Sequence, residues 1–169
     1  DHPNIKVTLN KSYEKGMEIK YDKAFLCIPI DQFYEFRYGL LPYRSIIFED
    51  KKLLTNDLPS AVVNFTDDSC YTRKTQWSLF PNSYGPTKKN KTITFERPCT
   101  LEENPNEYYY PVLTKDSAII YQKYKKLSRD EDKIIFCGRT GLYKYIDMIP
   151  AVNIHLRIAK DFLKNNILK

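Results

Sequence analysis

The sequence contains few of the residues that enzymes use for nucleophilic or metal chemistry. Among 169 residues there are two histidines, His2 and His155, and no serine lies in a nucleophile elbow. The four cysteines form no CxxC pair and do not have the spacing of metal ligands. A Ser-His-Asp triad and a zinc centre are therefore not expected, and His155 is expected to pack or to face solvent.

Glycine-rich motifs and long apolar runs are absent from the sequence as well. Its five glycines form no G-x-G-x-x-G after a strand, so these residues carry no dinucleotide fingerprint of their own. No run reaches the roughly 20 apolar residues that a membrane-spanning helix needs, and no secretory leader is visible. The first residue is Asp1 rather than methionine, so we expect a fragment or a processed product. The missing leader favours a cytoplasmic location.

Aromatic, apolar and basic residues are plentiful instead. The chain is 42% hydrophobic, which is enough for a core, and it holds 14 tyrosines and nine phenylalanines. Its net charge of +6 suits an anionic ligand, but the lysines are scattered rather than striped, so a nucleic acid partner is not expected. Cys27 and Cys137 lie in apolar runs, and we expect both to be buried free thiols, as suits a reducing compartment.

Hydrophobic periodicity predicts an α+β fold with an antiparallel sheet. Strands are expected at residues 5–9, 24–28, 45–49, 61–65, 71–80 and 91–96. The later strands follow one another without an intervening helix, which favours antiparallel pairing, and residues 91–96 should pair with the strand before them. The segment 81–86 has the chemistry of a turn.

Two helices are expected in the last third of the chain. After Thr114, an N-cap candidate, Ile120, Tyr124 and Leu127 recur at helical spacing. A second helix should begin at Asp147. The stripe that it should bury comprises Ile154, Ile158 and Phe162.

Residues 137–148 join the apolar run 134–137 to this second helix through a glycine turn. Such a turn would place free backbone N–H groups and a positive dipole end at one spot, which suits a phosphate, and Arg139 adds a permanent cation there. Tyr143, Tyr145 and Asp147 alternate as an extended segment would present them. An ordinary strand-to-helix connection with tyrosines packed beneath it is equally compatible with this spacing.

Arginine forks and tyrosine hydroxyls are the groups that a diphosphate site uses. The candidates are Arg73, Arg139, Tyr110 and Tyr145. Each residue alone is a weak signal, because a tyrosine is more often structural.

The string from Gly138 to Met148 closely resembles the C-terminal signature of the UDP-galactopyranose mutases. Residues 2–5, 29–31 and 41–45 resemble further stretches of that family. The resemblance covers essentially the whole chain, but only the C-terminal part of a family protein, whose glycine-rich flavin unit and helical domain are missing here.

The resemblance implies a flavoprotein isomerase that uses reduced FAD to interconvert UDP-galactopyranose and UDP-galactofuranose for cell-surface polysaccharide, including lipopolysaccharide, synthesis. It implies an antiparallel sheet domain over residues 38–106, between portions 1–37 and 107–169 of a Rossmann-like FAD-binding domain. UDP-galactose is the implied ligand, and a homodimer is open because bacterial relatives are commonly dimers. We expect these residues alone to lose FAD and to be inactive.

The resemblance also implies roles for individual residues. Arg73 and Arg139 are the implied catalytic residues. The implied substrate-binding residues are Asn64, Arg73, Tyr110, Tyr145 and Asp147. The implied cofactor-binding residues are Gly138, Arg139 and Met148.

One position departs from the family pattern. Thr94 stands where the family has a glutamate near the active site, and Glu96 is two residues further along the same strand face. Whether Glu96 takes its place is left open. Two other functions also stay open, namely a non-catalytic nucleotide-sugar-binding or scaffold piece and a related enzyme of the flavin amine oxidase type.

Overall fold

The computed structural model describes residues 2–52, 58–81, 92–105 and 107–167. The chain divides into two compact units, here called unit 1 (residues 1–40 and 115–169) and unit 2 (residues 41–114). Unit 1 is therefore built from both ends of the sequence, and unit 2 is inserted between them. Among the described residues, no helix is long and apolar enough to cross a membrane.

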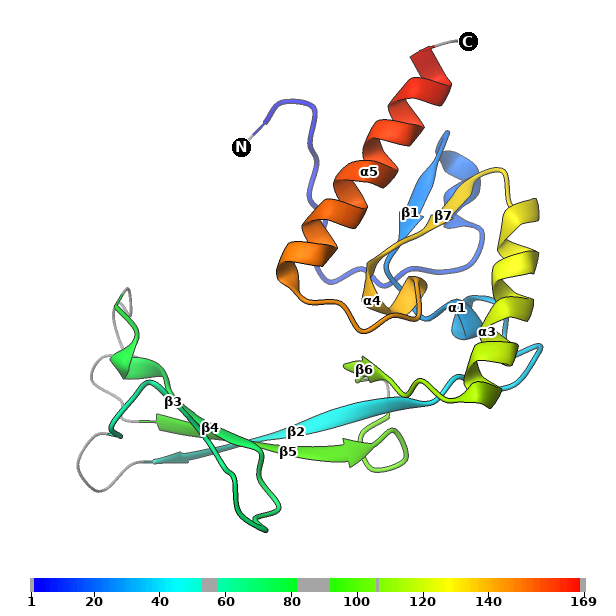
Figure 1. Cartoon of the computed structure of the whole chain (residues 1–169). Coiled ribbons are helices and arrows are strands. Elements are labelled where there is room, and N and C mark those ends of the chain that lie inside the picture. Colours follow the sequence, from blue (N-terminus) through cyan, green and yellow to red (C-terminus); the bar gives the residue numbers. More distant parts are fainter. Residues whose placement is uncertain (1, 53–57, 82–91, 106, 168–169) are drawn as a thin grey trace. The chain divides into compact units, whose positions relative to one another are not determined.

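Unit 1 contains the helices α1 (Ile30–Phe33), α3 (Lys115–Leu127), α4 (Gly138–Gly141) and α5 (Met148–Ile167), the 3₁₀ helices η1 (Met17–Lys20) and η3 (Ser128–Asp130), and the strands β1 (Ala24–Leu26) and β7 (Ile134–Phe136). The two strands form a parallel pair that lies between the helices (Figure 1). Because side chains alternate along a strand, the pair has two apolar faces to cover.

Each face of the parallel pair is covered through aromatic contacts. Phe162 of α5 packs edge-on against Phe25 of β1, with ring centroids 5.4 Å apart. On the other side, Phe33 of α1 packs against Phe136 of β7 at 5.3 Å. The stripe predicted for the last helix is confirmed, since Ile154, Ile158 and Phe162 are less exposed than the residues on the opposite face.

Tyr124 anchors α3 in the core of unit 1. It is fully buried, and its hydroxyl donates to the carbonyl of Gly39 at 2.8 Å and accepts from the N–H of Tyr38 at 2.9 Å. The helix begins directly after Thr114, as predicted. The predicted face is buried most completely at Tyr124, whereas Ile120 and Leu127 are half-buried.

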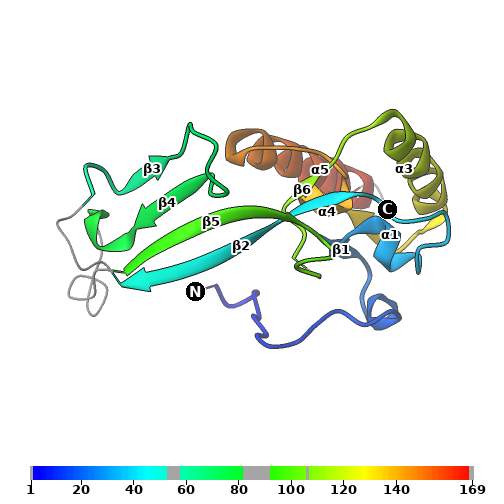
Figure 2. The same cartoon turned by 90° about the horizontal axis from the view of Figure 1, so that it is seen from below.

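Unit 2 is an antiparallel sheet of the strands β2 (Tyr43–Lys52), β3 (Val62–Asn64), β4 (Arg73–Gln76), β5 (Thr92–Thr100) and β6 (Tyr110–Pro111), with η2 (Trp77–Leu79) after β4. The strand order is β3-β4-β5-β2-β6. The long β2–β5 ladder curves along its length (Figure 2). The antiparallel sheet is confirmed, and so is the pairing of β5 with β4.

Some predicted elements differ from the structure. Residues 5–9 do not form a strand, and Ile5, Val7 and Leu9 are 68–78% exposed. Their alternation satisfies the pattern, but strands also need a partner backbone. The predicted strand 71–80 is limited to β4, and most of the predicted turn at 81–86 lies outside the described residues.

Candidate functional site

The register of unit 2 places three polar residues in one row across the sheet. Asn64 on β3 lies directly opposite Arg73 on β4, and Arg73 lies directly opposite Glu96 on β5. Directly opposed residues of antiparallel strands project to the same face of a sheet. The amide, the guanidinium and the carboxylate therefore share one face.

This face borders a cavity of about 570 Å³ that lies entirely within unit 2. Its lining residues are Arg44, Ser45, Ile46, Asn64, Thr72, Arg73, Glu96, Pro98 and Tyr110. Tyr110 enters the lining because β6 pairs with β2 and sets Tyr110 opposite Arg44. The volume falls within the range of small-molecule sites, about 300–1,000 Å³. Three of the predicted site residues, Asn64, Arg73 and Tyr110, thus meet at one cavity.

Arg73 is held in this cavity by a two-point ion pair with Glu96. Its Nε donates to Oε1 at 2.7 Å, and one terminal nitrogen donates to Oε2 at 2.6 Å. The Glu96 side chain is 8% exposed, whereas that of Arg73 is 45% exposed. The hydrogen bonds from Arg73 to Glu96 raise the pKa of the guanidinium further above its ordinary value. Glu96 therefore fixes the orientation of a permanent cation that still reaches solvent.

Sequence reasoning did not pair Arg73 with Glu96. The pairing depends on the register between β4 and β5, and a strand pattern does not specify which residues of two strands lie opposite each other. The sequence did offer one indication, because Arg73 and Glu96 carry opposite charges and lie in two strands that were expected to pair.

Thr94 and Glu96 lie on the same face of β5 but have different surroundings. The Thr94 hydroxyl donates to Asp50 at 2.6 Å and accepts from the Trp77 indole N–H at 2.7 Å. Glu96 lines the cavity and binds Arg73, whereas Thr94 is not among the lining residues. Of these two positions, Glu96 is the one that presents a carboxylate to the cavity.

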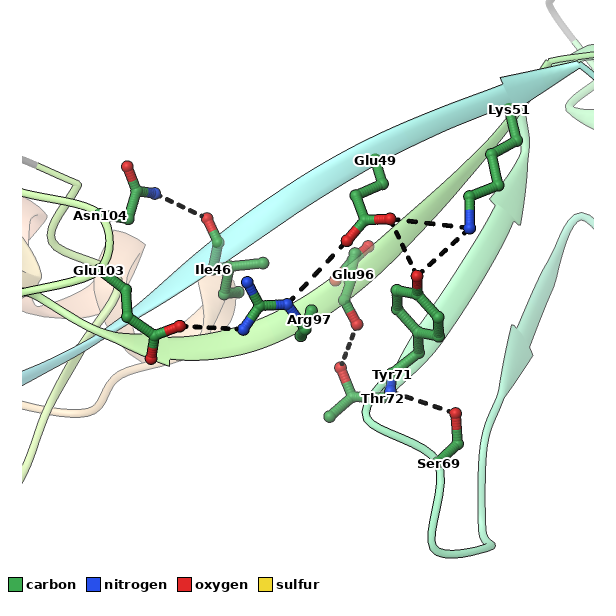
Figure 3. A network of polar contacts seen from close by, with 10 residues as sticks. All are labelled: Ile46, Glu49, Lys51, Ser69, Tyr71, Thr72, Glu96, Arg97, Glu103 and Asn104. Carbon is green, nitrogen blue, oxygen red and sulfur yellow. Dashed lines mark hydrogen bonds and ion pairs between the residues drawn. The ribbon is translucent and has the colours of Figure 1, made fainter.

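The opposite face of the same sheet carries polar contacts around Glu49, which Figure 3 draws together with contacts of the cavity-lining residues Ile46, Thr72 and Glu96. Glu49 accepts from the Tyr71 hydroxyl at 2.9 Å and forms ion pairs with Lys51 at 3.7 Å and Arg97 at 4.0 Å. Arg97 also pairs with Glu103 at 3.0 Å. These contacts link β2, β5 and the segment before β4. They also provide an arginine and a tyrosine that lie on the same sheet but away from the cavity.

The glycine turn of unit 1 is packed more tightly than the sequence indicated. Gly138 has φ of 71°, and a Cβ at this position would lie 3.1 Å from the Cβ and Sγ of Cys27. The Gly138 N–H donates to Nε2 of His155 at 2.7 Å. The expectation of free N–H groups is therefore wrong at Gly138, and α4 is a single turn.

His155 packs between the glycine turn and α5, which is one of the two roles expected for it. Because Nε2 accepts from Gly138, the ring proton lies on Nδ1, which is 2.5 Å from the Ala151 carbonyl. The His155 ring thus ties the glycine turn to α5.

Arg139 and Tyr145 lie together on the loop that leads to α5. One terminal nitrogen of Arg139 donates to the Ile146 carbonyl at 2.8 Å, and the guanidinium lies 5.4 Å from the centroid of the Tyr145 ring. Tyr145 is 57% exposed. Tyr143, in contrast, is buried and has φ of 45°, so the predicted extended alternation that included it is wrong.

Asp147 and Met148 lie where α5 begins. The Asp147 carbonyl accepts from the Ala151 N–H at 2.9 Å, as expected of an N-cap residue. Met148 is 86% exposed.

The predicted site residues thus form two groups. Unit 2 carries Asn64, Arg73 and Tyr110, and unit 1 carries Gly138, Arg139, Tyr145, Asp147 and Met148.

The chain belongs to the UDP-galactopyranose mutase family, whose sequence profile matches residues 1–145. It is 30% identical over 98% of its length to a dTDP-fucopyranose mutase of Escherichia coli and 30% identical over 98% of its length to a probable UDP-galactopyranose mutase of Klebsiella pneumoniae. It is 29% identical over 81% of its length to a UDP-galactopyranose mutase of Mycoplasma genitalium.

The chain spans less than half the length of these relatives. It covers 45% of the Escherichia coli protein, 42% of the Klebsiella protein and 35% of the Mycoplasma protein.

Proposed function

We propose that this chain is the C-terminal, substrate-binding part of a flavin-dependent mutase that interconverts UDP-galactopyranose and UDP-galactofuranose. The observation that carries the proposal is the convergence of Asn64, Arg73 and Tyr110 on one cavity of unit 2. The family supplies the reaction class, and the cavity supplies groups that suit a nucleotide diphosphate.

Arg73 is the principal diphosphate ligand in this proposal. Glu96 occupies Nε and one terminal nitrogen of the guanidinium, and the other terminal nitrogen has no hydrogen-bond partner among the described residues. That nitrogen can approach a phosphate oxygen while the ion pair holds the side chain in place. The Tyr110 hydroxyl and the Asn64 amide line the same cavity and add neutral donors.

Binding of the diphosphate serves the reaction because the bond between the sugar and the diphosphate must break and then form again. Opening the six-membered ring and closing the five-membered ring takes place between these two events. A diphosphate held in position returns as an effectively intramolecular reactant, which removes much of the entropic cost of reuniting two molecules. While the diphosphate is separated from the sugar, Arg73 balances its negative charge.

Gly138, Arg139 and Met148 are the residues that would hold FAD. Gly138 has no side chain, Arg139 supplies a cation fixed by the Ile146 carbonyl, and Met148 offers an exposed apolar surface, so the set fits a flavin. The reduced flavin supplies the electron-rich centre that the protein side chains do not. Tyr145 and Asp147 are assigned to the substrate on the same loop.

We propose further that unit 2 corresponds to a substrate domain, over about residues 38–106, inserted into a Rossmann-like FAD-binding domain. The parallel β1–β7 pair with flanking helices supports this reading. The enzyme would act in the cytoplasm, as a homodimer, in the supply of galactofuranose for cell-surface polysaccharides.

The test uses the full-length protein that contains this chain. It is reduced with dithionite and incubated with UDP-galactofuranose, and conversion to UDP-galactopyranose is followed by chromatography. dTDP-fucopyranose is assayed in parallel, because the Escherichia coli relative carries that name.

Turnover of the UDP-sugar at well above the rate of the dTDP-sugar supports the proposal. A preference for the dTDP-sugar would move the substrate assignment and leave the reaction class intact. Binding of UDP-sugars without turnover of either would favour the scaffold function.

A further inference from the structure

Cys27 and Cys137 face each other at the carboxyl ends of the parallel strands of unit 1. The register pairs Leu26 of β1 with Phe136 of β7, so the two cysteines are the next neighbours along the pair. The Cys137 N–H donates to the Leu26 carbonyl at 2.9 Å and extends the ladder to this point. The Sγ atoms of Cys27 and Cys137 are 3.3 Å apart. Figure 1 shows the two strands side by side, with α4 directly after β7.

The backbone geometry of this pair suits a disulfide. Neighbouring strands lie about 4.8 Å apart, and disulfides bridge Cα separations of about 4.4–6.8 Å. The sulfur atoms would have to approach to about 2.05 Å, a movement of little more than about 1 Å from their present separation. Side-chain rotation and small backbone shifts can supply such a movement.

The two thiols differ in access and in proton affinity. Cys137 is buried as expected, whereas Cys27 is exposed, so the expectation of a buried thiol is wrong for Cys27. Either sulfur can be the donor in this contact, and the arrangement in which the Cys137 thiol donates lowers the pKa of Cys27 to about 6. Donating that hydrogen bond raises the pKa of Cys137, and burial raises it further. The exposed sulfur is thus the nucleophile, and the buried one keeps its proton.

We propose that Cys27 and Cys137 form an oxidisable dithiol that hydrogen peroxide converts to a disulfide. The Cys27 thiolate attacks one peroxide oxygen, so that an S–O bond forms, the O–O bond breaks and hydroxide leaves. The Cys137 sulfur then attacks the Cys27 sulfur, so that the S–S bond forms and the S–O bond breaks. The departing hydroxide takes the Cys137 proton. Two thiols and one peroxide thereby become one disulfide and two waters.

The disulfide would act on the glycine turn. Cys137 immediately precedes Gly138, whose N–H donates to His155 and where an added Cβ would lie 3.1 Å from Cys27. Drawing Cys137 toward Cys27 therefore shifts the start of the segment that carries Arg139. This site is independent of the mutase proposal, because it requires only the fold of unit 1.

The experiment uses the 169-residue chain in dilute solution. The reduced protein receives submillimolar hydrogen peroxide, is quenched with catalase, and is then unfolded and labelled with N-ethylmaleimide. Intact mass and peptide mapping follow. The expected result is a chain that has lost two hydrogens and two of four labels, with a linked Cys27–Cys137 peptide that dithiothreitol releases. Cys70, which is exposed in unit 2, is the internal reference, and it should oxidise at least about 10-fold more slowly.

Two variants test the order of events. Cys137→Ser should leave a sulfenic acid on Cys27 that dimedone traps, and Cys27→Ser should leave Cys137 labelled and unoxidised. The proposal is overturned if the wild-type chain keeps four labels, if Cys27 goes to sulfinic acid without a disulfide, or if Cys70 reacts as fast as Cys27.

Discussion

Arg73 is the single residue on which the proposed substrate grip depends most. It supplies one of the two guanidinium groups that line the unit 2 cavity, the other being that of Arg44, and Glu96 holds it with two hydrogen bonds of 2.6–2.7 Å. In the full-length protein, Arg73→Ala should lower kcat/KM for the UDP-sugar by about 100-fold or more, since one charged donor at a site of developing negative charge is worth that much. Steady-state kinetics with the dithionite-reduced enzyme measure the loss.

Arg97→Ala is the matched control for Arg73→Ala. Arg97 follows Glu96 on β5, but it lies on the opposite face, where it pairs with Glu103 and Glu49. Its removal should change kcat/KM by less than about twofold, because surface ion pairs contribute little. Equal losses in the two variants would show that the kinetic effect reflects the sheet rather than the cavity.

The rate at which Cys27 reacts should depend on pH, and Cys137 should determine the pH at which the rate rises. The titratable groups that face Cys27 are Cys137 and His155, and the hydrogen bond from Cys137 lowers the pKa of the Cys27 thiol to about 6. Only the thiolate reacts with iodoacetamide, so alkylation of Cys27 should be slow below pH 6 and reach its plateau above it.

Two substitutions at Cys137 test whether its hydrogen bond causes the low pKa of Cys27. A hydroxyl donates a hydrogen bond in place of the thiol, so the midpoint should stay low, whereas Cys137→Ala removes the donor and should move the midpoint upward. Rates of alkylation by mass spectrometry at a series of pH values report both. An unchanged midpoint in Cys137→Ala would contradict the assigned cause.

At the scale of elements, the glycine turn after β7 combines an unusual backbone conformation with close packing. Gly138→Ala adds a Cβ at φ of 71° and 3.1 Å from Cys27, so both strain and overlap oppose it. The left-handed backbone costs about 1–2 kcal/mol, and overpacking adds about 1–3 kcal/mol. Gly16 has φ of 97° but open space around it, so Gly16→Ala should lose only the first of these two contributions.

Urea unfolding measures the stability of the two variants, and two spectroscopic probes follow the two units separately. The helices α3 and α5 belong to unit 1, so the far-ultraviolet circular dichroism signal reports mainly the unfolding of that unit. The single tryptophan, Trp77, lies in unit 2 and reports that unit by fluorescence. Gly138→Ala should lower the dichroism midpoint more than Gly16→Ala does. The opposite order would show that Cys27 yields to the added methyl group.

The elements that could be predicted were those whose signal is local. The strand and helix patterns of β2, β5, α3 and α5 carry their own periodicity, and the antiparallel order followed from short connections. Residues 5–9 show the limit, because their alternation matches a strand while no strand in the described part of the chain pairs with them.

The parts of the site that could not be predicted depend on register and on tertiary contact. The opposition of Arg73 and Glu96 needs the alignment of β4 with β5, and the hydrogen bond from Gly138 to His155 joins residues of α4 and α5. Neither follows from a local pattern. Asn64, Arg73 and Tyr110 could be named beforehand because the family resemblance, rather than periodicity, singled them out.

For the whole molecule, the small set of proposed flavin-binding residues predicts whether these residues alone retain FAD. Gly138, Arg139 and Met148 offer a flavin only a few contacts, and the chain spans less than half of its relatives. The purified 169-residue chain should therefore show no visible flavin absorbance, and added FAD should be removed by gel filtration. The full-length protein purified in parallel should be yellow. A yellow 169-residue chain would mean that these residues hold the cofactor unaided.

The insertion of unit 2 into unit 1 also sets an order of events on the ribosome. Residues 41–114 are contiguous, so their sheet can close as soon as β6 leaves the exit tunnel. Strand β1 must wait for β7, its parallel partner, which is synthesised more than a hundred residues later. During that interval the apolar side chains of β1 and α1 lack the contacts that β7 supplies, and long-range parallel pairing is slow to form. Nascent chains in which β6 but not β7 has left the exit tunnel should therefore be the ones that recruit chaperones, because the sheet of unit 2 can fold while β1 still lacks its partner strand.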